Sequence, residues 1–409
     1  MNLTCRMCKS RNVELFLELG SMPPADAFLR ADQLREPETH FPLDVHLCID
    51  CGLAQLGYVV SPEILYRRDY PYEASITLTG QKHWAELASS VAGRFAFPAG
   101  ALAVDVGSNV GILLEQFRNL GFRVLGVDPA SNIVRIAERR GIETIDELFS
   151  RTVAKQIRDT HGPAAVITAT NVFAHMDDLD GFVESVDLLL QDDGVLIIEA
   201  PSMLHLVQSC EYDTIYHEHL SYISVGPTRA FFAAVGFEVF DVEERDIHGG
   251  SIRIFVGRRS SRDVAARVAQ SVAAEEAGGI RDLARLRQFA ADVARNRVEL
   301  TNLLQDLRRS GKRIAGVGAP AKGMTLLNYC RIGPETLAFV TEKSQLKVGR
   351  FTPGTHIPVR PDRDLLSHEI DCGLLLAWNF AEEIMANLSE FRARGGTFII
   401  PIPRPRLIQ

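Results

Sequence analysis

The sequence has no apolar run long enough to cross a bilayer, and its first residues, MNLTCRMCKS, lack the charged and then apolar pattern of a secretory signal. It also lacks an excess of positive charge, because 44 Lys and Arg face 52 Asp and Glu and leave a formal net charge of −8. There is thus no whole-chain attraction to nucleic acid or anionic membrane. We expect a cytoplasmic monomer with no membrane or nucleic-acid partner.

Cysteine is scarce, and its distribution is uneven. Four of the 7 cysteines form two C-x-x-C pairs, CRMC (Cys5, Cys8) and CIDC (Cys48, Cys51), and such pairs in a reducing compartment indicate a metal rather than disulfides. Two turns with two thiolates each complete a tetrahedral shell for Zn²⁺ and leave no position for water, so the ion would be structural. His46, between the pairs, is an alternative ligand, but we expect the four cysteines.

Glycine, by contrast, marks one informative stretch, ALAVDVGSNVGILLEQFRNLGFRVLGVDPA. ALAVDV predicts a short apolar strand, GSNVG a tight loop, ILLEQFRNLG a helix closed by glycine, and RVLGVD a second strand. In such a βαβ unit the glycine loop lies at the carboxyl end of the first strand, where the backbone can closely approach a nucleotide-like ligand.

The acidic residues around this loop favour one ligand over another. Asp105 precedes the first glycine in the order D-x-G-x-x-x-G, whereas loops that bind dinucleotides read G-x-G-x-x-G. A carboxylate fits poorly beside a pyrophosphate but suits a cationic ligand with an amino-acid part, and Asp128 ends the second strand, where it can accept hydrogen bonds from ribose hydroxyls. We therefore expect S-adenosylmethionine (SAM) rather than NAD. The predicted cofactor-binding residues are Asp105, Gly107, Asn109, Gly111, Asp128 and Asn171.

The following segments continue an alternating α/β pattern. ETIDEL, AAVITATNVFAHMDDL and GVLIIEAPS predict three more strands, and PTRAFFAAVGFEVFDVEE with GGSIRIFVGR predicts a helix and two closing strands. Between the fifth strand and that helix lies IYHEHLSYIS, residues 215–224, with two histidines, a glutamate and two tyrosines. In open α/β sheets such a loop overhangs the carboxyl ends of the strands, where ligands bind. We predict that this stretch lies at the reaction site.

The last third of the chain begins with helical spacing and then repeats the strand–glycine loop–helix plan in KRIAGVGAPAKGMTLLNYC. TLAFVTEKS, DCGLLLAW and GGTFIIPIP predict further strands, which indicates a second, smaller nucleotide-binding-like domain. Lys322, beside glycine amides and a helix N-terminus, suits a phosphate, although it could equally be a lysine that solvates its loop. Lys347 and Arg350, in a Gly- and Pro-rich loop, also suit an anionic group.

The combination of the two cysteine pairs, DVGSNVG, YHEHLSY and GAPAKG resembles the sugar C-methyltransferases, which make branched deoxysugars for bacterial natural products such as antibiotics. The resemblance spans essentially the whole chain. It implies methyl transfer from SAM to a ring carbon next to the ketone of a TDP-4-keto-6-deoxysugar, commonly C-3. It does not separate C-3 from C-5 methylation or define the substituent on C-3. The residues that match active-site positions of the family are Tyr70, His175, Tyr216, Glu218 and His219.

On these grounds we expect an α/β protein in three parts. Residues 1–75 form a small zinc-binding module, and residues 76–259 form a class I SAM-methyltransferase domain with a Rossmann-like fold. Residues 260–409 form a helical connector and a C-terminal Rossmann-like domain that binds the substrate or its nucleotide.

The implied chemistry defines roles for the polar cluster. A carbon becomes nucleophilic only after it loses a proton, so the enzyme must supply a base and stabilise the developing enolate oxygen. Histidine suits the first task because its pKa is near neutrality, and we predict His219 as the base, oriented or tuned by Glu218. Tyr216 would hold the sulfonium methyl or the ketone oxygen. His175 would donate to the enolate, and Tyr70 would contact the substrate.

Several assignments stay open at this level. An extended YHEH would put Tyr216 and Glu218 on one side and the two histidines on the other, whereas an irregular loop relaxes that rule. His217 is expected to be a structural histidine, and metal binding by the histidine pair is an alternative without an evident third ligand. In HGGSIR, Ser251 and Arg253 are candidate substrate contacts, although Arg253 lies in an expected strand and could face solvent.

Three other functions compete with this interpretation. The enzyme could be an O- or N-methyltransferase of a sugar or small metabolite, which would use a similar base. The cysteine pairs could bind RNA, but the acidic balance and the lack of a basic run with interleaved aromatics argue against it. An oxidoreductase with NAD at GAPAKG is the third possibility.

Overall fold

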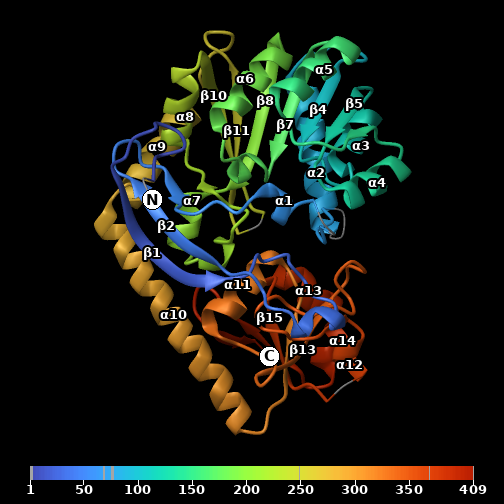
Figure 1. Cartoon of the computed structure of the whole chain (residues 1–409), viewed down its shortest axis with the longest axis vertical. Coiled ribbons are helices and arrows are strands. Elements are labelled where there is room, and N and C mark those ends of the chain that lie inside the picture. The colour runs from blue at the N-terminus through green and yellow to red at the C-terminus, as the bar shows by residue number, and fades with distance from the viewer. Residues whose placement is uncertain (1–2, 68–69, 75–77, 248, 368, 409) are drawn as a thin grey trace.

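Three β-sheets organise the chain in the computed structural model, which describes residues 3–67, 70–74, 78–247, 249–367 and 369–408 (Figure 1). A four-stranded sheet belongs mainly to the N-terminal part, a seven-stranded sheet to the central part and a six-stranded sheet to the C-terminal part. The predicted α/β fold in three parts is confirmed. The boundaries after residues 75 and 259 stay a prediction.

The N-terminal sheet is antiparallel and takes its last strand from a distant segment. Its order is β1-β2-β3-β9, with β1 (Val13–Met22), β2 (Phe41–Cys48), β3 (Ala54–Leu56) and β9 (Ser221–Tyr222). In β9, Tyr222 pairs with Ala54 and Ser221 with Gln55. The stretch that holds the predicted catalytic residues is thus bonded to the N-terminal sheet. The connections contain η1 (Ala31–Arg35) and α1 (Pro62–Leu65).

The central sheet has the order β10-β11-β8-β7-β4-β5-β6. Strands β4 to β8 run parallel, and β11 and β10 add antiparallel strands at one edge. The strands are β4 (Leu102–Val106), β5 (Arg123–Val127), β6 (Thr144–Ile145), β7 (Ala164–Thr170), β8 (Leu190–Pro201), β10 (Phe237–Arg245) and β11 (Ser251–Arg258). Because β4 lies between β5 and β7, the chain changes direction across the sheet there, which is where open α/β sheets bind ligands.

Helices cover both faces of the central sheet, and this explains why β4 and most of β7 are buried along their whole length. Apolar residues of α2 and α3 pack with one set of strand residues, while those of α5, α6 and α8 pack with the alternate set. The helices of this part are α2 (Leu78–Arg94), α3 (Ile112–Asn119), α4 (Ser131–Arg139), α5 (Arg151–His161), α6 (Leu179–Leu189), α7 (Met203–Gln208) and α8 (Val225–Ala234). Short 3-10 turns are η2 (Phe173–His175) and η3 (Tyr212–Thr214).

The C-terminal sheet has the order β14-β13-β12-β15-β16-β17, and only β17 is antiparallel to its neighbour. Its strands are β12 (Ile314–Val317), β13 (Leu337–Glu342), β14 (Val359–Pro361), β15 (Cys372–Leu375), β16 (Thr397–Ile400) and β17 (Arg406–Ile408). Its helices are α11 (Ala321–Cys330), α12 (Asp364–Ser367), η4 (Trp378–Phe380), α13 (Ala381–Asn387) and α14 (Ser389–Ala393). β12 lies between β13 and β15, so GAPAKG also follows a strand at which the chain changes direction.

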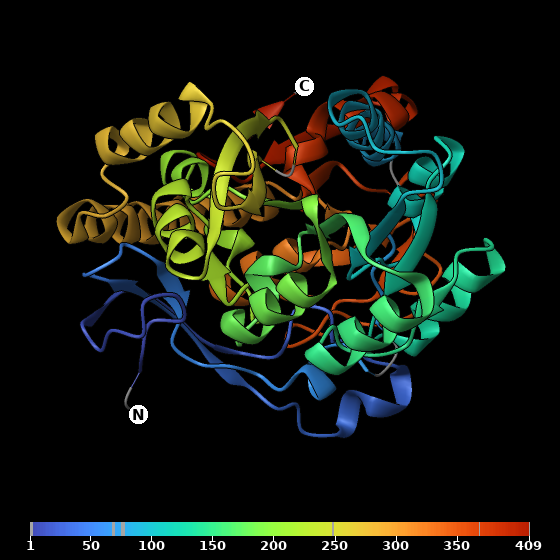
Figure 2. The same ribbon diagram turned by 90° about the horizontal axis from the view of Figure 1, so that it is seen from above.

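Helices α9 (Ala266–Gly278) and α10 (Leu283–Arg309) connect the central and C-terminal parts along one side of the molecule (Figures 1 and 2). α10 also packs against β1, and one apolar core joins residues of all three parts, among them Leu43, Tyr212, Leu300 and Met324. Within the described residues, no helix is both long enough and apolar enough to span a membrane.

Candidate functional site

The four paired cysteines converge at the N-terminal sheet. Their sulfur atoms all lie within 4.8 Å of one another, and the Cys5–Cys51 and Cys8–Cys48 sulfur pairs are each 3.5 Å apart. A tetrahedral Zn²⁺ with Zn–S bonds of about 2.3 Å requires sulfurs about 3.8 Å apart, so the four thiolates fit the ion. His46 does not belong to this group. The four-cysteine site was predicted, and no water-binding position is left for catalysis.

The glycine loop after β4 has the conformation that its sequence predicted. Gly107 has a φ of +68°, and a Cβ atom there would lie 2.2 Å from Cγ2 of Val172, so a side chain is excluded. The loop is held by Asp128, whose Oδ2 accepts a hydrogen bond from the backbone N–H of Asn109 at 2.9 Å and whose Oδ1 accepts one from Ala130 at 2.9 Å. Each carboxylate oxygen keeps a second lone pair for a ribose hydroxyl.

Asp105 lies just before this loop and is buried. It accepts a hydrogen bond from the Thr168 hydroxyl at 2.6 Å, and burial raises the pKa of its carboxyl to about 7. Gly111 begins α3 with a φ of +76°. Asn171 follows β7, and its N–H donates to the Glu199 carbonyl at 2.7 Å. All six residues predicted for the cofactor therefore lie at the carboxyl ends of β4, β5 and β7, where the sheet changes direction.

The segment 70–74 connects this loop to the YHEH stretch. The Asn109 side chain donates to the Tyr72 carbonyl at 3.0 Å and accepts from the Ala74 N–H at 2.9 Å. Tyr70 packs beside the apolar cluster of Val110, and its hydroxyl donates to Oε2 of Glu218 at 3.0 Å. A cofactor in the glycine loop would thus lie next to the predicted catalytic cluster.

The YHEH stretch forms a turn, so the extended alternative considered for it is wrong. The N–H of His219 donates to the Tyr216 carbonyl at 2.9 Å, and this brings the two rings together with centroids 4.0 Å apart. His217 points elsewhere, with Nε2 3.2 Å from the Phe41 carbonyl oxygen. The turn therefore groups Tyr216 with His219 and separates the two histidines.

The hydrogen bonds of His219 define its tautomer. Its Nδ1 lies 2.8 Å from the Thr214 carbonyl oxygen, which can only accept, so Nδ1 carries the hydrogen and Nε2 carries the lone pair of the neutral ring. The ring of His175 lies 5.1 Å from that of His219 and 6.2 Å from that of Tyr66. Burial lowers the pKa of His175 to about 4, so this ring is neutral at pH 7. Its Nε2 is buried and has no hydrogen-bond partner among the described residues.

Glu218 completes the cluster and has an unusual protonation state. The pKa of its carboxyl is raised to about 8, mainly by burial and also by the negative charge of Asp26, although Tyr70 and Lys347 act in the opposite direction. Glu218 therefore holds its proton at pH 7. Burial raises the pKa of Tyr216 well above the ordinary value for a phenol, and the Glu218 carboxylate, once it has ionised at higher pH, acts in the same direction.

Three residues near this cluster were missed in the sequence. Asp26, in PPADAF, and Tyr66 and Tyr72, in LYRRDYPY, all lie close enough for their charge or ring to act on the cluster. Tyr66 has a buried hydroxyl without a hydrogen-bond partner in the described part of the chain. The unusual density of tyrosine in residues 66–72 was a signal that could have pointed to two of them.

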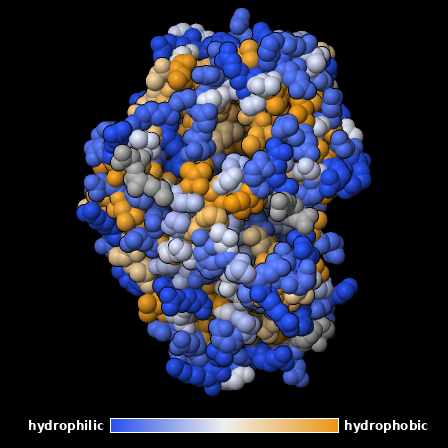
Figure 3. Space-filling model, in the orientation of Figure 1, coloured by the Kyte–Doolittle hydropathy of each residue, from blue (hydrophilic) through white to orange (hydrophobic). Residues whose placement is uncertain are grey.

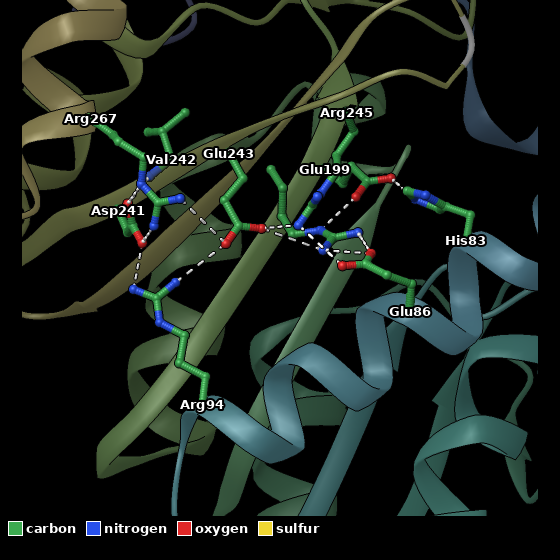
Figure 4. Close-up of polar contacts among 10 residues, drawn as sticks. His83, Glu86, Arg94, Glu199, Asp241, Val242, Glu243, Arg245 and Arg267 are labelled. Atoms are coloured by element: carbon green, nitrogen blue, oxygen red, sulfur yellow. Dashed lines mark hydrogen bonds and ion pairs between the residues drawn. The ribbon is translucent and has the colours of Figure 1, made fainter.

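The residues predicted in HGGSIR have partners within the protein. Ser251 is buried, and its hydroxyl donates to the Ile247 carbonyl at 3.1 Å. Arg253 does not face solvent; its side chain is 0% exposed, with Nε bonded to Glu199 at 2.8 Å and two nitrogens 3.2 Å from Glu86. These contacts belong to a network of acidic and basic side chains on α2, β8, β10 and β11 (Figure 4). Their role in substrate binding stays a prediction.

Two of the basic residues predicted to bind an anion lie beside carboxylates. Lys347 is buried, and its Nζ donates to Asp26 at 3.0 Å and to the Ala319 carbonyl at 2.9 Å. Nζ of Lys322 lies 4.0 Å from Oδ1 of Asp213 and 4.3 Å from the ring centroid of Trp378. Arg350 is half-buried in the loop after Lys347. Because carboxylates accompany both lysines, a bound phosphate would have to compete with them.

Family models cover most of the chain. A model described as "Putative zinc binding domain" matches residues 5–66, one described as "Methyltransferase domain" matches residues 81–242, and one described as "C-methyltransferase C-terminal domain" matches residues 246–403. Together with the glycine loop and the four-cysteine site, they define the class: this is a SAM-dependent methyltransferase with a structural zinc ion.

Comparison with individual proteins narrows the class. C-methyltransferase NovU of Streptomyces niveus is 38% identical over 405 residues, which cover 99% of this chain and 96% of that protein. The chain belongs to the C-methyltransferase family. Ubiquinone biosynthesis O-methyltransferase of Rhodopseudomonas palustris is 24% identical over 99 residues, which cover 24% of this chain and 39% of that protein.

Among solved structures, magnesium protoporphyrin IX methyltransferase (ChlM) from Synechocystis PCC 6803 with bound SAH has 16% identity and a TM-score of 0.36. The match covers 47% of this chain and 91% of that one. The plantazolicin methyltransferase BpumL in complex with SAH has 10% identity and a TM-score of 0.34, over 43% of this chain and 82% of that chain.

Proposed function

We propose that this C-methyltransferase acts on a TDP-4-keto-6-deoxysugar and methylates C-3, next to the ketone, in the biosynthesis of a branched deoxysugar. The observation that carries the proposal is the turn at residues 216–219. It holds an imidazole with a defined lone pair against a neutral phenol, next to the segment 70–74 that contacts the glycine loop. In the space-filling view, this face of the molecule is hollowed in its upper half (Figure 3).

His219 is the base in this proposal. Its Nδ1–H is fixed by the Thr214 carbonyl, so Nε2 takes the proton from C-3, and the C–H electron pair forms the enolate. SAM, when bound at the glycine loop, supplies the methyl group on a positively charged sulfur. A new C–C bond forms as the carbon–sulfur bond breaks, its electrons stay on sulfur, and His219 later gives its proton to solvent.

The groups that donate hydrogen bonds to the enolate oxygen must not carry a negative charge themselves. His175 is neutral, and its buried Nε2, if protonated, can donate to that oxygen. The protonated carboxyl of Glu218 is a second donor, held by the Tyr70 hydroxyl. Two preorganised donors in a buried site stabilise developing negative charge far better than water does. Tyr216 then contacts the methyl group or the ketone.

We assign the nucleotide to the C-terminal domain. Lys322 lies in the first turn of α11, where backbone N–H groups and the helix dipole favour an anion. Arg350 is a further candidate for the diphosphate. Lys347 is not, because Asp26 already neutralises it.

The direct test is to incubate the protein with SAM and a small panel of TDP-4-keto-6-deoxysugars and to analyse products by NMR. We expect a new quaternary ring carbon with an attached methyl group, at C-3. A quaternary centre at C-5 would correct the position but keep the enolate mechanism. A methoxy or N-methyl signal would refute that mechanism.

A further inference from the structure

The arginine inside the first cysteine pair is buried. Arg6 is 6% exposed, and its backbone N–H donates to Oε1 of Gln55 at 2.9 Å. The amide nitrogen of Gln55 donates in turn to the Thr4 carbonyl at 3.0 Å, so the backbone on both sides of Cys5 is bonded to one side chain. A buried guanidinium costs free energy unless hydrogen bonds and an opposite charge compensate it. The partners of the guanidinium therefore indicate what Arg6 does.

The guanidinium bonds to the two segments that carry the proposed catalytic histidines. Its Nε donates at 2.9 Å to Oδ1 of Asp177, which lies two residues after His175. Its Nη1 donates at 3.1 Å to the carbonyl of Leu220, which directly follows His219. Because a guanidinium is planar and its N–H bonds have fixed directions, one rigid group spans both segments.

The Leu220 side of this bridge is held from further directions. Nη1 also donates to the Leu56 carbonyl at 3.0 Å, and the N–H of Leu56 donates to the same Leu220 carbonyl at 2.9 Å. Ser221 pairs with Gln55, the residue that holds the Arg6 backbone. The first cysteine turn, β3 and the end of the turn at residues 216–219 thus form one hydrogen-bonded unit. Asp177 attaches the His175 segment to it.

We propose that Arg6 is a positioning residue that sets the spacing of His175 and His219 in the active site. The two rings come from separate segments, and their centroids are 5.1 Å apart. The inference rests on the proposed function, in which His219 removes the proton and His175 donates to the enolate oxygen. Both groups must meet adjacent atoms of one substrate, and a displacement of about 1 Å in such a pair can cost about 10²-fold in rate.

Two variants interrupt the bridge. Arg6→Lys keeps the positive charge but removes the fork that spans both segments. Asp177→Ala removes only the arm towards His175, and because the Asp177 side chain is 59% exposed, the fold should tolerate this change. If Arg6→Lys does not fold, Asp177→Ala still decides. Each variant is used as the full, zinc-loaded chain, with its zinc content measured by a colorimetric chelator.

The spacing of the two rings is read by NMR on protein with ring-labelled histidine. The cross-peak from the nuclear Overhauser effect between the rings of His175 and His219 is assigned by its absence in His175→Gln. We expect it in the wild type, and we expect both variants to weaken or lose it. In the active enzyme, kcat of Arg6→Lys should fall by about 10²-fold. The KM for SAM should change by no more than a few-fold, because Asp128 holds the glycine loop.

The matched control is a second acidic residue of the same region. Asp180 is 46% exposed at its side chain, and it pairs at 2.6 Å with Lys9, which follows the first cysteine pair. Asp180→Ala therefore removes an ion pair between the zinc-binding and central parts but keeps the Arg6 bridge. We expect the wild-type cross-peak and the wild-type kcat in this variant.

The proposal is overturned if Arg6→Lys and Asp177→Ala keep the wild-type cross-peak, or if Asp180→Ala weakens it as much as Asp177→Ala does. The cross-peak requires no substrate, so its loss in the two bridge variants, without turnover of any TDP-sugar by the wild type, would refute the proposed substrate alone. Methylation of a TDP-sugar at equal rates by the wild type and Arg6→Lys, with equal cross-peaks, would refute the positioning role alone.

Discussion

At the scale of single residues, two histidines that are only two positions apart have different neighbours and different hydrogen-bond partners. His217 lies against the carbonyl of Phe41, at the start of β2 in the N-terminal sheet. His219 lies between Tyr216 and His175, with its tautomer fixed by Thr214. The turn, rather than the composition of the stretch, decides which ring lies beside Tyr216 and His175.

Replacement of His219 by Gln should reduce solvent-deuterium exchange at the substrate C–H by about 10²- to 10⁴-fold, because the base is lost. Exchange is measured by NMR with the keto-sugar that the enzyme accepts. His217→Gln is the matched control and should change the rate by no more than a few-fold. Equal losses in the two variants would contradict the assignment of the base.

Glu218 should make the protein less stable as the pH rises. The carboxyl ionises near pH 4.5 in the unfolded chain but near pH 8 in the folded one, so between these values only the folded state holds the proton. The free energy of unfolding should therefore fall by about 1.4 kcal/mol per pH unit across this window through this group. Glu218→Gln should remove that fall, so its stability relative to the wild type should rise from pH 5 to pH 8 in urea titrations. A constant difference would contradict the buried, protonated state.

At the scale of elements, the zinc site is linked to the turn at residues 216–219, the proposed catalytic turn. Arg6 lies inside the first cysteine pair, and its guanidinium donates to the Leu56 carbonyl at 3.0 Å and to the Leu220 carbonyl at 3.1 Å. Leu220 directly precedes β9 and follows His219. One arginine thus connects the first cysteine turn to the end of the catalytic turn by hydrogen bonds.

Cys48→Ser should release the zinc ion and lower both the melting temperature and the rate of methyl transfer, because Arg6 loses its fixed position. Zinc content is measured by a colorimetric chelator, and melting by circular dichroism. Cys372→Ser, which changes a buried cysteine outside the site, is the control and should retain zinc. Full activity in a zinc-free protein would show that the turn does not depend on the module.

The charged network in Figure 4 joins α2 to the central sheet through Arg253. Removal of the Arg253 guanidinium leaves the buried Glu199 carboxylate without this partner. Arg253→Met should therefore lower the free energy of unfolding by about 3–5 kcal/mol. Arg295→Met, at an exposed pair with Asp292, should lower it by less than about 1 kcal/mol. Urea unfolding measures both. Similar small effects would mean that His83, which already lies 2.5 Å from the Glu199 carboxylate, is a sufficient partner for it.

Features that depend on neighbouring residues could be predicted from the sequence, whereas contacts between distant segments could not. Strand β4, the glycine loop and Asp128 follow one another closely, and their periodicity and turn residues define the unit without the rest of the chain. The pairing of β3 with β9 and the contact of Asp26 with Lys347 join segments more than 150 residues apart. Such contacts leave no periodic trace, and for this reason Asp26 and its ion pair with Lys347 were missed in the sequence.

At the scale of the whole molecule, the three parts are joined more closely than their sequences suggest. One apolar core contains residues of the N-terminal sheet, of the loop before the catalytic turn, of α10 and of α11. Polar contacts at Asp26 and at Glu38 tie the N-terminal part to the C-terminal part as well. If one part unfolded alone, it would expose the apolar surface that the other two parts bury against it.

We therefore expect one cooperative unfolding transition in differential scanning calorimetry, although a chain of 409 residues would ordinarily divide into independent domains. The ratio of calorimetric to van't Hoff enthalpy should be near unity in the zinc-loaded protein. Two resolved transitions, with that of the C-terminal part unaffected by Asp26→Asn, would contradict a shared core.

The pairing of β3 with β9 has a consequence for the evolution of the chain. A recombination event that exchanged the N-terminal segment for another would leave β9 without its neighbour and the end of the catalytic turn without Arg6. Selection would remove such chimaeras, so the N-terminal segment and the segment that carries β9 should have been inherited together. Anyone who grafts this chemistry onto another scaffold must transplant the zinc-binding segment along with the catalytic turn.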